Sequence, residues 1–341
     1  MFLQQIHPSK DSYSFRKKIL QQLKRKIPYE AYCFTTVDSE TLLSTGAITD
    51  ERIELLHPQL FENEYKEEDL NRYTELFEKK IYCNTIFKAA KGDVSNSKRF
   101  REILSPHGFI DELRAVLVYK NHCYGFLTLY RTEEQGVFSQ AEINYLKQSL
   151  TFIAKMLKES IFYCYPKVKL RDEAVIETGI IILDQTLNII STNQAGSYFL
   201  KWIRQEEQIE ENCLPRPIRA ICLQAKEGSS SKAPKIMLHA FNHSFMTLTV
   251  SSLFTSSSQK AVLVERISPN EAKKILSFLY HLTIRECELV ELLLEGKSTK
   301  CIAEELSIST YTVQDHLKSI FMKVGINSRK ELISKISGIC R

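Results

Sequence analysis

The residues best suited to chemistry lie in the segment TYTVQDHLKSIFMKV, residues 310–324. Apolar residues recur there at spacings of four, three and four, which is typical of a helix with one buried stripe: Val313, Leu317, Ile320 and Val324. At about 100° per residue, the opposite side carries Tyr311, Asp315, Lys318 and Met322, with Gln314 on its flank. Amide, carboxylate and ammonium groups on one helix face can donate to or accept from base edges in a DNA groove. Periodicity alone would equally fit a solvated face of a small helical bundle.

Three more helices are expected around this segment, and each has a recognisable end. The signals are a Thr283–Glu286 capping box, a terminal Gly296, a capping Ser298, a terminal Gly325 and a capping Ser328. A short helix, a tight turn and a longer helix form a helix-turn-helix. Hydroxyl groups, a lysine and helix-end N–H groups suit phosphate oxygens, and they gather where the helices begin, at Thr299, Lys300, Ser309, Thr310 and Thr312.

This part of the chain resembles the LuxR/NarL-type DNA-binding domain. The resemblance covers about 55 residues and rests on LTIRECE, EGKSTKCIAEELSIS and TVQDHLKSIFMKVGINSRKEL. It implies that helix 310–324 enters the major groove and that Gln314, Asp315 and Lys318 contact bases. It also implies contacts from Thr299, Lys300, Thr312 and Lys323 to the DNA backbone. Thr299 stands where this family often has Asn, and Gln314 where it often has Lys or Arg, so the preferred operator stays open.

Charge is distributed in agreement with that expectation. The chain has 341 residues, 46 Lys and Arg, 41 Asp and Glu, and a net charge of +5. Residues 296–341 contain eight bases and four acids, which leaves +4 in this short segment. A local basic excess suits a phosphate backbone. At roughly 100–200 residues per domain, the length predicts two or three domains.

The sequence predicts a multidomain protein in which two α+β sensor domains precede an all-α, four-helix domain. An N-terminal arm would span 1–15. Residues 16–160 resemble a GAF domain through DELRAVLVYKNHCYGFLTLYR and FSQAEINYLKQSLTFIAKML, a hairpin and a closing helix. Residues 173–268 resemble a PAS domain through GIIILDQTLNIISTNQAGSYFL, which contains Asn193 and Ala195. A linker helix over 269–280 would lead to the helix-turn-helix domain, 281–341.

Two features leave alternatives open. Helix 138–157 has an apolar stripe at spacings of three and four, formed by Ile143, Leu146, Leu150, Ile153 and Leu157. The stripe fits packing on the domain's own sheet, or pairing with a second copy. Nine cysteines without a CxxC pair fit buried, reduced thiols, or a redox or metal sensor. We identify no cofactor signature and no metal site, although a small-molecule ligand of either sensor is conceivable.

Several classes are disfavoured by what the sequence lacks. The N-terminus has no signal-peptide pattern and no apolar run approaches 18 residues, so we expect a cytoplasmic protein without a membrane partner. Nucleotide-binding, hydrolase and metalloprotease motifs are missing, so we expect no enzyme and no catalytic residues. The expected partners are double-stranded DNA, a second copy of the chain and RNA polymerase.

Two functional hypotheses follow. The first is a transcription factor in which a signal at a sensor domain changes how two helix-turn-helix units are presented. The second is a signalling scaffold with a degenerate DNA-binding domain. Asp315 is the residue that favours the second hypothesis, because an acid on the side of the helix that would face DNA repels phosphate. The objection is weak, since aspartate can accept a hydrogen bond from the N4 amine of cytosine.

Overall fold

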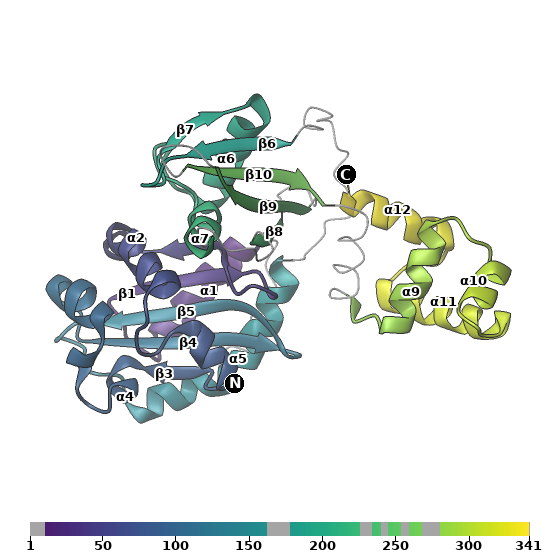
Figure 1. Cartoon of the computed structure of the whole chain (residues 1–341). Helices are drawn as coiled ribbons and strands as arrows, with labels where there is room; N and C mark the ends of the chain where they lie inside the picture. Colours follow the sequence, from purple (N-terminus) through teal and green to yellow (C-terminus); the bar gives the residue numbers. More distant parts are fainter. Residues whose placement is uncertain are drawn as a thin grey trace. The chain divides into compact units, whose positions relative to one another are not determined.

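The computed structural model describes residues 11–161, 178–225, 234–239, 245–253, 259–267 and 280–340. The chain divides into two compact units. One contains nearly all of two sheets, and the other contains the C-terminal helices with short pieces of the second sheet, namely His239, Phe245–Thr247 and Glu265–Arg266 (Figure 1). Most of the predicted arm and nearly all of the predicted linker helix lie outside the described residues. Within the described ranges, every helix is too short or too polar to cross a membrane.

The first sheet has five strands in the order β2-β1-β5-β4-β3. Their bounds are Ala31–Val37 for β1, Ser44–Thr49 for β2, Cys83–Thr85 for β3, Asp111–Tyr119 for β4 and His122–Arg131 for β5. The predicted hairpin is confirmed, because β4 and β5 pair antiparallel around Lys120 and Asn121. Both turn residues have positive φ, 49° and 65°, which matches the right-handed twist of the flanking strands.

Helices α1 (Ser12–Lys24) and α5 (Gln140–Ile161) pack on one another, and α5 covers β4 and β5. Ser139 and Glu142 form a capping box at the start of α5, with the Glu142 amide donating to Ser139 and the Ser139 amide to Glu142. The apolar stripe of α5 is buried along its whole length. It therefore packs on its own domain, and the alternative of a dimer seam along this stripe is wrong.

The opposite face of the first sheet is covered by α2 (Glu51–Lys66) and α3 (Tyr73–Glu78). Shorter helical turns complete this part of the chain: α4 (Ile86–Ala89), η2 (Val94–Asn96), η3 (Phe100–Leu104) and η4 (Ser105–His107). Aromatic rings contribute to the packing, and Tyr73 stacks on Phe126 with ring centroids 4.0 Å apart. Tyr73 also shares a hydrogen bond with Thr128 of β5.

A buried charge cluster, which we call the Arg99 network, lies on this same face. Arg99 is fully buried and donates to both carboxylate oxygens of Glu112, at 3.1 and 2.9 Å. It also donates to Asn63 at 2.9 Å. Arg114 lies 2.8 Å from the same Glu112 carboxylate and 2.5 Å from Glu64. Because every charge has an opposite partner, the network tolerates burial that an isolated charge would not.

The second sheet also has five strands, in the order β7-β6-β10-β9-β8. Their bounds are Gly179–Leu183 for β6, Ile189–Thr192 for β7, Lys235–His239 for β8, Phe245–Ser252 for β9 and Lys260–Arg266 for β10. Strand β6 ends at Leu183, and β7 begins at Ile189. Asp184 stabilises the turn between these two strands, because its carboxylate accepts hydrogen bonds from the amides of Thr186 and Asn188.

Asn193 joins β6 to helix α6 (Gln194–Glu207). Its side-chain oxygen accepts from the amides of Ile180 and Gly196, and its amide donates to the Thr178 carbonyl. A Cβ atom at Gly196 would lie 2.4 Å from the Ile180 carbonyl oxygen, so only glycine allows this approach. The sequence NQAG, residues 193–196, thus holds the start of α6 close to β6.

Helix α7 (Arg216–Gln224) connects the two sheets, because it packs against α2 and β2 of the first. Arg216 forms ion pairs with Glu207 at the end of α6 and with Glu54 of α2. Glu207 also accepts from the Ala47 amide of β2, at 3.4 Å. We call this set of contacts the Arg216 bridge. It joins the two sheets within one compact unit.

Helix α1 begins at Ser12, capped by Asp11, within the segment 1–15 that was predicted to be an arm. The described cysteines are free thiols, namely Cys33, Cys83, Cys123, Cys213, Cys222, Cys287 and Cys301. Burial raises the pKa of the Cys83, Cys123 and Cys222 thiols to about 12, which disfavours the reactive thiolate. Among the described residues, no cluster of acidic, histidine or cysteine side chains is placed to hold a metal.

Candidate nucleic-acid interface

The C-terminal unit contains the four predicted helices: α9 (Ile284–Leu294), α10 (Thr299–Glu305), α11 (Thr310–Val324) and α12 (Arg329–Cys340). Their predicted ends are confirmed. Thr283 and Glu286 form a capping box, Ser298 accepts from the Cys301 amide, and Ser328 accepts from the Glu331 amide. Gly325 ends α11 in the left-handed region, at φ 69°. The two helices of the helix-turn-helix are therefore α10 and α11.

Packing fixes which side of α11 faces the domain interior. Val313, Ile320 and Val324 are buried, and Leu317 is half-buried. The buried residues of the other helices meet them and include Leu289, Leu293, Ile302 and Ala303. The apolar stripe predicted from spacing is thus the packed side, and the opposite side of α11 is free to contact a partner.

The three predicted base-reading residues lie on exposed parts of α11. Asp315 and Lys318 have 76% and 78% of their side chains exposed, and Gln314 is also exposed. Lys318 Nζ lies 3.7 Å from Asp315 Oδ1, a weak pair one helical turn apart. Tyr311 and Met322 are 79% and 80% exposed. These side chains make up what we call the reading face: Tyr311, Gln314, Asp315, Lys318 and Met322.

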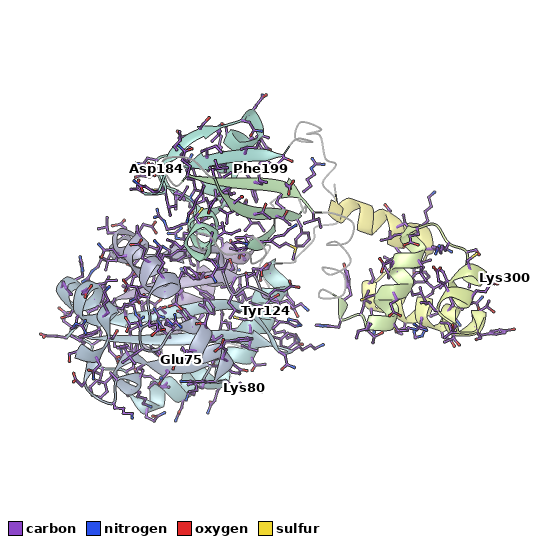
Figure 2. The ribbon with its side chains drawn as sticks, in the orientation of Figure 1. Glu75, Lys80, Tyr124, Asp184, Phe199 and Lys300 are labelled. Atoms are coloured by element: carbon purple, nitrogen blue, oxygen red, sulfur yellow. The ribbon has the colours of Figure 1, made fainter. Side chains whose placement is uncertain are left out.

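Most residues predicted to contact phosphate lie at the starts of α10 and α11. Lys300 and Thr310 are exposed, and Figure 2 labels Lys300 on the C-terminal unit. Ser309 caps α11 by accepting from the Thr312 amide at 3.0 Å, and the two hydroxyls lie 2.9 Å apart. A shallow depression of about 520 Å³ between the helices is lined by Lys300, Ala303, Glu304, Ser307, Ile308, Ser309 and Thr310. Thr299, which is half-buried, stands beside it at the first position of α10.

Lys323, the remaining predicted backbone contact, has an internal partner. Its ammonium lies 2.6 Å from a Glu286 carboxylate oxygen, and Ser319 donates to the other oxygen at 2.7 Å. Burial raises the pKa of Glu286, but the Lys323 ammonium, the Thr283 amide and the Ser319 hydroxyl outweigh burial and lower it to about 2. Lys323 therefore ties α11 to α9, and a contact with DNA would be a second task for the same side chain.

Sequence reasoning missed these ties between helices. Arg285 of α9 donates to the Leu306 carbonyl at the end of α10, and Arg329 of α12 donates to the Lys297 carbonyl. Lys297 in turn pairs with Glu305. The pairs are separated by eight or more residues, so a search for local helical patterns could not find them. They hold the reading face in a fixed orientation relative to the rest of the unit.

Comparison with known proteins places this unit in a family. Residues 280–336 match the model described as bacterial regulatory proteins, luxR family. The spore germination protein GerE of Bacillus subtilis is 42% identical over 55 residues, which are 16% of this chain and 74% of GerE. The monoamine regulon transcriptional regulator of Klebsiella aerogenes is 46% identical over 54 residues, 16% of this chain and 24% of that protein. The chain thus spans only about a quarter of that longer relative.

The first unit shows a weaker similarity to known structures. A GAF domain/HD domain protein from Geobacter sulfurreducens superposes with a TM-score of 0.34 and 13% identity, over 46% of this chain and 97% of that one. A superposition of this quality assigns neither a fold name nor a ligand to the two sheets. The C-terminal match is of another kind, because its 42% identity extends over 74% of GerE. The chain belongs to the luxR family of bacterial regulatory proteins, and its C-terminal unit is that family's DNA-binding helix-turn-helix domain.

Proposed function

We propose that this protein is a sequence-specific transcriptional regulator that inserts α11 into the major groove of double-stranded DNA. The exposed polar side of α11 is the observation that carries the proposal. Gln314, Asp315 and Lys318 leave hydrogen-bonding capacity unused on a helix whose other side is packed. In the major groove, the Lys318 ammonium would donate to guanine or thymine acceptors, and the Asp315 carboxylate would accept from cytosine or adenine amines.

Residues around the reading face would hold the phosphate backbone. Lys300 supplies a positive charge at the start of α10, and Ser309 and Thr310 supply hydroxyls at the start of α11. Thr299 and Thr312 stand at the first and third positions of those helices, within first turns whose partial positive charge attracts anions. Lys323 would reach phosphate only with the part of its ammonium that Glu286 and the His281 carbonyl leave available. Such contacts position the protein without reading sequence.

The two sheets would act as a signal-responsive region, GAF-like and then PAS-like. Their connection through the Arg216 bridge supports treating them as one sensor, because a shift of α2 would move a buried arginine that also holds α6 and the start of α7. A small-molecule ligand or a protein signal would then change how the helix-turn-helix is presented. The route would be the chain that joins residue 267 to residue 280.

The regulator would act as a homodimer on two half-sites and would meet RNA polymerase at its promoters. The stripe of α5 is excluded as the dimer seam, so the contact would lie elsewhere. Half-sites about one helical turn apart would place two copies of α11 in successive major grooves on one side of the duplex. DNA binding of this kind also implies a cytoplasmic location in a bacterium.

Selection of genomic fragments by the purified full chain, at two salt concentrations, tests the proposal directly. We expect a shared motif with two-fold symmetry and binding that weakens as salt rises, since counterions are released from the contacted phosphates. A motif without symmetry would contradict the dimer. Uniform binding without any motif would favour the scaffold hypothesis, in which Asp315 marks a domain that no longer reads DNA.

A Lys318→Ala variant locates the reading face on the selected operator. Removal of the Lys318 side chain should weaken the binding free energy for the operator by roughly 1–3 kcal/mol. Folding should be unchanged, because Lys318 is exposed. Lys66→Ala is the matched control, since Lys66 is also an exposed lysine in a same-helix pair, 3.2 Å from Glu62. Titration of labelled operator by fluorescence anisotropy compares the two. Equal affinities of the Lys318 variant and the wild type would show that α11 reads DNA with another side.

A further inference from the structure

Tyr311 is an exposed aromatic residue at a position where the fold does not require one. It is the second residue of α11 and is 79% exposed. The capping of α11 is provided by Ser309 and Thr312 on either side of it, through their hydroxyls and the Thr312 amide. Neither capping nor core packing therefore accounts for an aromatic ring here.

The position of the ring relates it to the reading face. Tyr311 precedes Asp315 by four residues and Lys318 by seven, so the three side chains lie on one side of the helix. In helix-turn-helix proteins the N-terminal residues of the recognition helix approach base edges most closely. Asp315 and Lys318 already pair with each other at 3.7 Å. The ring at the N-terminal end is then the largest apolar surface that the helix can bury against the groove.

We infer that Tyr311 is a specificity-determining residue whose ring packs on the 5-methyl group of a pyrimidine in the major groove. The inference rests on the proposed function of α11. A methyl group is the one apolar feature that a base pair presents in the major groove, and thymine carries it in unmodified DNA. A ring with a single hydroxyl is poorly suited to paired hydrogen bonds with a base, but its carbon surface complements a methyl group.

A base-analogue scan across the selected operator tests this contact. Each thymine is replaced singly by uracil, which removes the methyl group and keeps the base-pairing edge. Wild-type protein should lose about fourfold in affinity at one position of each half-site, the effect expected for one buried methyl group. In the Tyr311→Ala variant the same replacement should have no effect, so the two changes should be non-additive. Additive effects at every thymine would overturn the inference.

Two control variants separate the role of the ring from the roles of its hydroxyl group and of exposed apolar surface in general. Tyr311→Phe keeps the ring and should retain the response to uracil; if it behaves as Tyr311→Ala does, the hydroxyl is the contact, which would also overturn the inference. Met322→Ala is matched in exposure, at 80%, and lies on the same side of α11 about 16 Å towards its C-terminal end. It should lower affinity less than Tyr311→Ala does and leave the uracil response intact.

A second arm distinguishes the source of the methyl group. Each cytosine of the operator is replaced by 5-methylcytosine. Tighter binding at one cytosine that disappears in Tyr311→Ala would support the methyl contact and assign it to modified cytosine. If the wild-type protein selects no operator, the proposed function fails. If it selects one but ignores every methyl change, only the role of Tyr311 fails.

Discussion

The Arg99 network and the reading face of α11 both contain acidic and basic side chains, but those of the network are buried and those of the reading face are exposed. In the first, Arg99, Arg114 and Glu112 are buried, and Glu112 accepts from Arg99 through both oxygens. In the second, Asp315 and Lys318 are more than three-quarters exposed and share one pair at 3.7 Å. Charges whose partners are all internal stabilise a fold. Charges with unused hydrogen-bonding capacity on a rigid helix are available to an external partner. The Arg99 network therefore stabilises the fold, whereas the reading face is available for binding.

The largest expected effect would come from breaking the Arg99 network. Glu112→Ala leaves Arg99 and Arg114 buried without their shared carboxylate, so the free energy of unfolding should fall by about 3–5 kcal/mol. Urea denaturation followed by circular dichroism measures it. Glu62→Ala removes an exposed glutamate paired with Lys66 and should change stability by less than about 0.5 kcal/mol. Similar values for the two variants would mean that the network is not structural.

An intermediate effect is expected at Glu286, a buried charge within the DNA-binding unit. Its pKa is lowered to about 2 from an ordinary value of 4.5, so the carboxylate stabilises the fold fully above about pH 4.5. That contribution should diminish as the pH falls from 4.5 towards 2. The difference in unfolding free energy between wild type and Glu286→Gln should be roughly 1.5–3 kcal/mol at pH 6 and smaller at pH 3. A difference that stays constant over this range would contradict the assignment.

The smallest effect is expected at Lys300, whose contact with DNA would be purely electrostatic. Lys300→Ala should weaken binding to all sequences alike and reduce the slope of log affinity against log salt by about 0.9. Stability should not change, because the side chain is exposed. Lys330→Ala, an exposed lysine of α12 outside the predicted interface, should leave the slope unchanged. A sequence-dependent loss for Lys300→Ala would instead make it a base-reading residue.

The helix-turn-helix was predictable because its determinants are local. Spacing located the buried side of α11, and single residues such as Ser298, Ser328 and Gly325 located helix ends that the structure confirms. The predicted contacts of the reading face with bases remain predictions. Local reasoning also found Asn193, but it did not show that Asn193 holds two amides and a carbonyl beside a glycine that no other residue can replace.

Long-range pairings were beyond such reasoning. Arg99 lies in a polar stretch that gave no sign of a buried charge, and its partner Glu112 belongs to a strand 13 residues away. Lys323 was assigned to DNA by resemblance, whereas its ammonium meets Glu286, 37 residues earlier. The α5 stripe fitted two kinds of packing, because periodicity indicates that a helix side is buried without identifying what buries it.

The Arg216 bridge has a consequence for how regulators of this kind could be recombined. A buried arginine that pairs with Glu54 and Glu207 requires both carboxylates, so the second sheet cannot be exchanged alone for that of another regulator. A hybrid that replaces everything up to residue 267 preserves the bridge, whereas one joined between 161 and 178 leaves Arg216 facing a foreign helix. In gene fusions the two sheets would then be exchanged together. New combinations of the two sheets with a helix-turn-helix domain would arise by joining chains before residue 280.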